Sequence, residues 1–212
     1  MKKAFLLLGI SVLVMPAQAA TRQVESNGTA VLFEASGGAG ISQFGLGLGI
    51  QPEDARSGFG GLYFESTTLD DRQTLSGRSL GNHETTIRTL GIRGFSVQGN
   101  DDEPIGADVT FGLSQTKTEG YDRTGMSARA AFYFPVMEKT TWYAGLDVRP
   151  KLLSFDWSKD VLMELGFDAG VDVRVLPNLG LYAYYYYENM LTDDFDSWFL
   201  GSGVAAGLSW VW

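Results

Sequence analysis

The sequence predicts an all-β fold, a closed antiparallel transmembrane β-barrel with ten strands. Three observations lead to this prediction. Apolar and polar residues alternate along many segments, and a period of two is that of a β-strand. No run of 18 apolar residues occurs after residue 19, so no membrane-spanning helix is expected. The segment Gly207–Trp212 places Trp210 and Trp212 on one face of a strand, as in the aromatic girdle of a membrane barrel.

The first five predicted strands carry this alternation with increasing clarity. The first is short, and in the second Phe44, Leu46 and Leu48 alternate with glycines. In the fifth, Val109 and Phe111 alternate with polar residues and glycine. The predicted spans are 30–36, 43–51, 59–67, 85–97 and 105–117. Strands of this kind cross an outer membrane in about nine to eleven tilted residues.

The last five predicted strands follow the same pattern. The eighth is the longest clear one, with apolar residues from Met163 to Val175 at every second position. The ninth is short and rich in tyrosine, and the tenth ends the chain. The predicted spans are 126–134, 140–151, 161–175, 180–188 and 199–212. Eight strands is the alternative, if the first two segments form only a loose hairpin.

The predicted connections alternate in length. Those after the second, fourth, sixth and eighth strands are compact, with Pro135 and Pro177 as breakers. Those after the third, fifth, seventh and ninth strands are expected to be longer and more polar, and 69–84 is the longest. Short periplasmic turns opposite longer outer loops are typical of outer-membrane barrels. An even number of strands agrees with both termini in the periplasm.

Both ends of the chain predict export and membrane assembly. Lys2 and Lys3, the apolar stretch 5–15 and Ala17-Gln18-Ala19 have the form of a signal peptide, so we expect residues 1–19 to be removed and 20–212 to form the barrel. Gly207, Trp210 and Trp212 resemble the C-terminal signal read by the barrel-assembly machinery of Gram-negative bacteria. Ala205 departs from that signal, because a polar residue is usual there.

Composition narrows the class of protein. Without Lys2 and Lys3, 14 Lys and Arg stand against 25 Asp and Glu, which gives a formal net charge of −11 and argues against a nucleic-acid partner. There is no Cys, so neither disulfides nor thiol chemistry are expected. We expect a monomer in the outer membrane, with membrane lipid and the assembly machinery as partners and with no cofactor.

The inner face carries the chemistry. If the apolar sets face lipid, charged residues point into the lumen, because Arg or Lys at the bilayer midplane costs about 2–4 kcal/mol. The predicted lumen charge network is Arg93, Asp108, Arg129, Asp147, Arg149, Glu164, Asp168, Asp172 and Arg174, with Glu34, Glu65 and Lys151 on the same face. Buried charges persist when they are paired and hydrogen-bonded, so we expect a salt-bridge plug. A narrow conducting path is the alternative.

A barrel enzyme that uses His83, either an omptin-like protease or a lipid hydrolase, is the second alternative. A ten-stranded barrel invites comparison with the omptin proteases, which need a His-Asp pair beside a pair of acids. The single His83 lies in the long third connection between Asn82 and Glu84, without an adjacent Asp. A Ser-His-carboxylate set would have to be built around it. We therefore expect no catalytic residue, and the absence of His and Cys at ligand spacing predicts no metal site.

Residues 140–190 combine four features: Trp142–Val148, Pro150–Phe155, the strand with Glu164 and Asp168, and the tyrosine-rich Leu181–Tyr187 after the Pro177 turn. In these features the segment resembles the YfaZ family of outer-membrane proteins. It implies a small outer-membrane barrel and carries over no catalytic residue. We expect a structural, interaction or small-ligand role.

Overall fold

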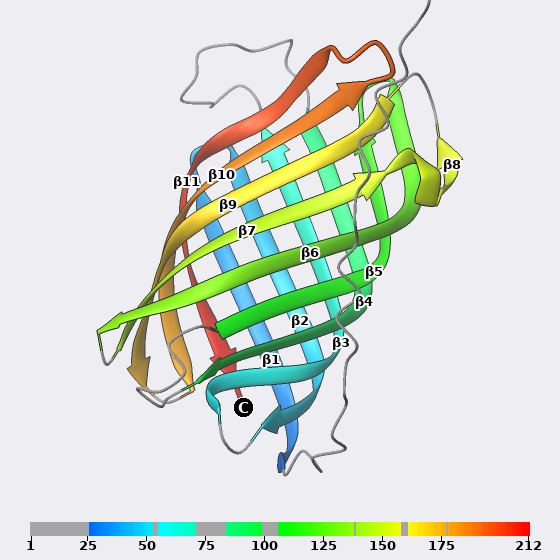
Figure 1. Cartoon of the computed structure of the whole chain (residues 1–212). Helices are drawn as coiled ribbons and strands as arrows, with labels where there is room; N and C mark the ends of the chain where they lie inside the picture. The colour runs from blue at the N-terminus through cyan, green and yellow to red at the C-terminus, as the bar shows by residue number, and fades with distance from the viewer. Residues whose placement is uncertain are drawn as a thin grey trace, which may run out of the picture.

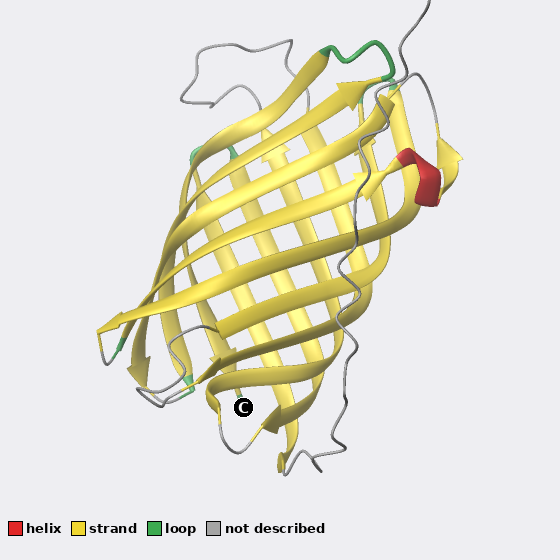
Figure 2. Ribbon diagram, viewed as in Figure 1, coloured by secondary structure: helices red, strands yellow, loops and turns green. Residues whose placement is uncertain are grey.

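The computed structural model describes residues 26–52, 55–70, 84–98, 106–137, 139–157, 161–176 and 178–212. Within these residues the chain forms a closed antiparallel barrel of tilted strands with one turn of 3-10 helix at its rim (Figures 1 and 2). The predicted signal peptide, residues 1–19, lies outside the described residues.

Ten strands make the barrel wall, as predicted. They are β1 (Ser26–Gly38), β2 (Ile41–Pro52), β3 (Ala55–Asp70), β4 (Glu84–Gln98), β5 (Gly106–Thr118), β6 (Tyr121–Met137), β7 (Thr140–Pro150), β9 (Val161–Leu176), β10 (Leu179–Thr192) and β11 (Ser197–Val211). Each pairs with its neighbours along the chain, apart from the interposed β8, and β1 pairs with β11 to close the wall. The eight-strand alternative is wrong, because β1 and β2 are paired in register from Thr29 to Gly38.

The short strand β8 (Ser154–Trp157) does not form an eleventh strand of the barrel wall. The chain leaves β7, turns through η2 (Lys151–Leu153) and returns beside β6, where Arg123–Gly125 pair with β8. The main part of β6, from Ala128 to Met137, pairs with β7. Thus β8 continues the β7 edge after a bend at the rim (Figure 1).

The predicted alternation of connection lengths is wrong at the fifth strand. The expected long connection is a two-residue turn, Glu119-Gly120, because β6 begins at Tyr121 and not at residue 126. Tyr121, Arg123 and Gly125 are buried on the inner face, so the alternation continues almost to the turn. Gly120 has φ +71°, a conformation that a tight hairpin turn uses and that glycine adopts without strain.

The barrel has two distinguishable ends. We call the end with the turns at 39–40, 119–120 and 193–196 the loop end, and the end where β11 finishes the terminal end (Figure 1). Outside, exposed Leu, Ile and Val side chains form a band around the wall, including Leu48, Leu62, Ile92, Val109 and Val204. In the described part of the chain, no helix is long and apolar enough to span a bilayer.

Candidate functional site: the lumen

The inner face of the barrel is built from polar residues and glycine by the same alternation that exposes apolar residues outside. On β5, Asp108, Thr110 and Ser114 are buried, whereas Val109 and Phe111 are about half exposed. The strand period thus places a carboxylate with 0% exposure in the interior of a wall with an apolar outer surface. Every residue of the predicted charge network lies in a described strand, and each is buried or half-buried.

Four of these side chains, together with Glu34, form a continuous line of ion pairs, which we call the transverse chain. It runs from Glu34 on β1 to Arg93 on β4, Asp108 on β5, Arg129 on β6 and Asp168 on β9. Arg93 bonds Glu34 and makes a two-pronged contact with Asp108, at 3.1 Å for Nε–Oδ1 and 2.9 Å for Nη2–Oδ2. Arg129 lies 3.2 Å from Asp108 and 2.8 Å from Asp168. The Glu34–Arg93 pair reaches past β2 and β3, and the Arg129–Asp168 pair reaches past β7, so the chain extends through the lumen at both of its ends.

Tyrosines support the transverse chain. The Tyr63 hydroxyl lies 2.6 Å from Glu34 Oε2 and 3.0 Å from Glu65 Oε2, and the Arg93 guanidinium sits 4.6 Å from the centre of the Tyr63 ring. The Tyr133 hydroxyl donates to Asp108 at 3.4 Å. These contacts satisfy the lone pairs that a buried carboxylate must fill to be retained.

A second group, the Arg149 cluster, gathers three carboxylates around one guanidinium. Arg149 is 1% exposed and lies 2.5 Å from Asp147 and 2.7 Å from Glu164, and it also pairs with Glu188 on β10. Glu164 accepts further hydrogen bonds, each at 2.7 Å, from the hydroxyls of Thr116 and Tyr121. The sequence predicts Arg149 and Glu164 on this face but does not single out Glu188. The signal that could have identified Glu188 is its position, because it follows the inward-facing tyrosines of β10 at the next inward position.

The remaining predicted pair, Asp172 and Arg174, stands apart. Arg174 Nε lies 3.2 Å from Asp172 Oδ1, on the same strand. Lys151, predicted to face the lumen, is instead in η2, where it pairs with Asp193 at 2.7 Å on the exposed rim. The physical reason is the bend after Pro150, which ends the strand before residue 151.

Arg123 is a lumen residue that the sequence prediction missed. It is 0% exposed and bonds Ser154 Oγ at 2.9 Å, Ser114 Oγ at 2.8 Å and the Met126 carbonyl at 2.6 Å. Arg123 lies two and four residues before Gly125 and Ser127, so the strand alternation could have placed it on the inner face. The prediction missed it because the predicted strand began only at residue 126.

Apolar clusters lie inside the barrel near both of its ends. Near the terminal end, Leu32, Phe59, Phe95 and Val211 are buried together, with the two phenylalanine rings stacked 6.3 Å apart. A larger cluster toward the loop end includes Leu69, Ile87, Val161, Tyr186 and Met190. The lumen is therefore filled by apolar groups as well as by charge.

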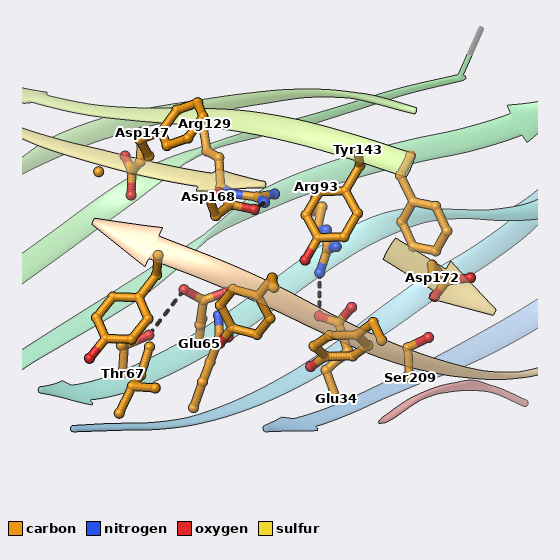
Figure 3. Close-up of a pocket in the computed structure, with 18 of the residues that line it drawn as sticks. Glu34, Glu65, Thr67, Arg93, Arg129, Tyr143, Asp147, Asp168, Asp172 and Ser209 are labelled. Atoms are coloured by element: carbon orange, nitrogen blue, oxygen red, sulfur yellow. Dashed lines mark hydrogen bonds and ion pairs between the residues drawn. The ribbon is translucent and has the colours of Figure 1, made fainter. Parts of the chain in front are cut away.

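A cavity of about 130 Å³ remains between these groups. Figure 3 shows Glu34, Glu65, Arg93, Arg129, Asp147 and Asp168 facing this space from different strands. Its charged lining consists of six carboxylates and four guanidiniums, all from described residues: Glu34, Glu65, Asp147, Asp168, Asp172 and Glu188, with Arg93, Arg129, Arg149 and Arg174. Ligand pockets for drug-sized molecules are usually about 300–1,000 Å³, so this space suits only a small molecule.

The predicted assembly signal occupies the closing strand. Trp210 and Trp212 point outward and are 46% and 80% exposed. Trp212 and Val31 exchange backbone hydrogen bonds of 2.5 and 2.8 Å, which join β11 to β1. Gly207 allows close approach of the two strands, since a Cβ there would lie 2.4 Å from the Ala35 carbonyl oxygen.

The geometry of the lumen does not test the enzyme alternative, because His83 lies outside the described residues. Among the residues that the structure describes, no group of three or more His, Cys, Asp or Glu is arranged to hold a metal ion. The described lumen residues contact one another through ion pairs and hydrogen bonds.

Comparisons with known proteins give structural neighbours only. No family model matches the chain and no curated protein matches it, so membership of the YfaZ family stays a prediction. Among solved structures, outer-membrane expressed OmpT of Vibrio cholerae is 16% identical with a TM-score of 0.39, over 82% of this chain and 57% of that one. The chain thus spans little more than half the length of that neighbour.

Two further neighbours match over most of both chains. The KdgM porin is 9% identical with a TM-score of 0.39, over 85% of this chain and 98% of that one. The translocator domain of the autotransporter NalP from Neisseria meningitidis is 11% identical with a TM-score of 0.35, over 91% and 92%. At these values the neighbours carry no inference about what this chain binds or does.

Proposed function

We propose that this protein is a small, monomeric, non-enzymatic β-barrel of the Gram-negative outer membrane, with a lumen closed to bulk solute flow and a structural or small-ligand role. The main observation in favour of a closed lumen is the transverse chain. Four successive ion pairs link β1 to β9 through the interior, and Asp108 at its centre is 0% exposed.

The outer surface supports the membrane location. Leu62, Ile92 and Val109 are 62%, 66% and 53% exposed, an arrangement that water disfavours and lipid does not. Exposed aromatic residues lie toward both ends, with Trp210 and Trp212 at the terminal end and Phe155 and Phe195 at the loop end. Exposed aromatic residues at both ends of an apolar outer band are typical of a transmembrane barrel.

Planar-bilayer recording tests closure. We expect the unmodified barrel to show no large steady conductance and the double variant Arg93→Ala, Arg129→Ala to show an increase, because it removes both cations that hold the transverse chain. Lys117→Ala is the control, since Lys117 pairs with Asp122 at an exposed site. A large steady conductance of the unmodified protein would refute closure. Heat-modifiable gel migration verifies that each variant is folded.

A narrow path for small cations is the second candidate. It is favoured by one observation, the excess of carboxylates over guanidiniums in the cavity lining of the described residues. A small conductance whose reversal potential in a salt gradient shows cation preference would support this candidate over a fully closed barrel.

A further inference from the structure

One arginine of the predicted charge network differs from the other three in its bonding. Arg93, Arg129 and Arg149 each pair with at least two carboxylates. Within the described residues, Arg174 pairs with Asp172 alone, and its buried Nη1 has no hydrogen-bond partner there. A buried guanidinium donor without an acceptor is costly, so its retention needs an explanation.

A second unpartnered group lies beside it. Ser209 of β11 is 5% exposed, and its Oγ has no hydrogen-bond partner in the described part of the chain. Gly180 of β10 is paired in register with Arg174 on one side and with Ser209 on the other. Asp172 and Ser209 line the same end of the cavity in Figure 3.

The three polar side chains converge above Gly180. A Cβ on Gly180 would lie 2.8 Å from both Asp172 Oδ2 and Ser209 Oγ, and 3.2 Å from Arg174 Cζ. We call this group, Asp172, Arg174, Gly180 and Ser209, the Gly180 niche. The side chains of Arg174 and Asp172 are 15% and 12% exposed, and both line the cavity together with Ser209, so the niche borders the lumen.

The chemistry of the niche is two-sided. The guanidinium and the hydroxyl donate hydrogen bonds and suit a carboxylate, whereas Asp172 accepts them and suits an ammonium group. Glu34, in register with Ser209, adds negative charge nearby. Since the cavity lining carries more carboxylates than guanidiniums, it repels a simple anion but tolerates a ligand with both charges.

We propose that the Gly180 niche binds a small zwitterion of the amino-acid type. Its carboxylate bonds Arg174 Nη1 and Ser209 Oγ, and its ammonium group bonds Asp172. The volume of about 130 Å³ limits the ligand to a compact molecule. The proposal deepens the small-ligand role and rests on that proposed function.

Titration calorimetry with glycine, on purified barrel folded in lipid vesicles, tests the proposal. We expect saturable binding of glycine, with acetate and methylammonium at least about tenfold weaker, because each keeps only one of the two charge-assisted contacts. Equal binding of acetate or methylammonium would overturn the zwitterion assignment, as would the absence of saturable glycine binding.

Two matched pairs of variants locate the site. Gly180→Ala fills the niche with a methyl group, and Gly94→Ala is its control because a Cβ there meets no atom within 4 Å. Ser209→Ala removes the hydroxyl, and Ser202→Ala is its control, since Ser202 is on the same strand and 2% exposed but does not line the cavity.

We expect about a tenfold or larger loss of glycine affinity in Gly180→Ala and Ser209→Ala, and none in the two controls. If Gly180→Ala does not fold by heat-modifiable migration, Ser209→Ala decides. Unchanged affinity in folded Ser209→Ala would overturn the site. Conductance of the same preparation separates the two proposals: an open pore that binds glycine contradicts closure alone, and a closed barrel that does not bind contradicts the niche alone.

Discussion

Replacing Arg149 with Met should strongly destabilise the barrel. Arg149 is 1% exposed, and its guanidinium is shared by Asp147, Glu164 and Glu188. The substitution keeps most of the side-chain volume but leaves three carboxylates around an uncharged group. Removing one partner of a buried ion pair costs about 3–5 kcal/mol, a large part of the roughly 5–15 kcal/mol that holds a typical domain folded.

Equilibrium urea unfolding in lipid vesicles, followed by tryptophan fluorescence, measures this loss. Lys151→Met is the matched control, because Lys151 is two residues further on and pairs with Asp193 at an exposed site. An exposed pair contributes about 0–1 kcal/mol, so the control should unfold almost like the unmodified protein. Adding Glu164→Gln to Arg149→Met should recover part of the loss, with a coupling of about 0.5–3 kcal/mol. If Arg149→Met and Lys151→Met unfold alike, the Arg149 cluster does not contribute to stability as argued.

Two further predictions concern the wall. Trp212→Asp should be exported but poorly inserted, because it places a charge at the girdle beside the backbone bonds to Val31; compact, heat-modifiable migration in outer-membrane fractions would contradict this. Gly47→Ala should destabilise the barrel by about 1–3 kcal/mol in urea unfolding, because its Cβ would lie 2.6 Å from the Phe59 ring. Gly94→Ala, which meets open space, should cost less than Gly47→Ala, and equal losses would rule out the steric explanation.

Much of the wall follows from the sequence because one rule governs every strand. Outward residues are apolar and inward residues are small, polar or charged, so the period of two fixes both the strands and the face of each charge. Arg93 and Asp108 could be assigned to the interior on this basis alone. The end of a strand is less certain where the rule weakens, as at Tyr121–Gly125, where the inner and outer sets differ little in polarity.

The filling of the lumen could not be predicted in the same way. Phe59, Leu69 and Ile87 face inward near the ends of β3 and β4, where their neighbours along the strand are glycine or polar, so the alternation there runs in the opposite sense to that of the membrane-facing wall. The ion-pair partners also depend on curvature. Arg129 on β6 reaches Asp168 on β9 past the intervening β7, a contact that strand register alone does not give.

The glycines of β2 connect these two levels. Gly45 and Gly47 are inward positions at which a Cβ would lie 2.4 Å from the Tyr63 hydroxyl oxygen and 2.6 Å from the Phe59 ring. The bare wall of β2 therefore gives the rings of β3 room to lie across the lumen. Tyr63 in turn hydrogen-bonds Glu34 at 2.6 Å and packs under the guanidinium of Arg93. A side chain at residue 45 would displace the Tyr63 ring and with it the Glu34–Arg93 pair, the first link of the transverse chain. The ion pairs of the lumen therefore depend on the glycines of the neighbouring wall.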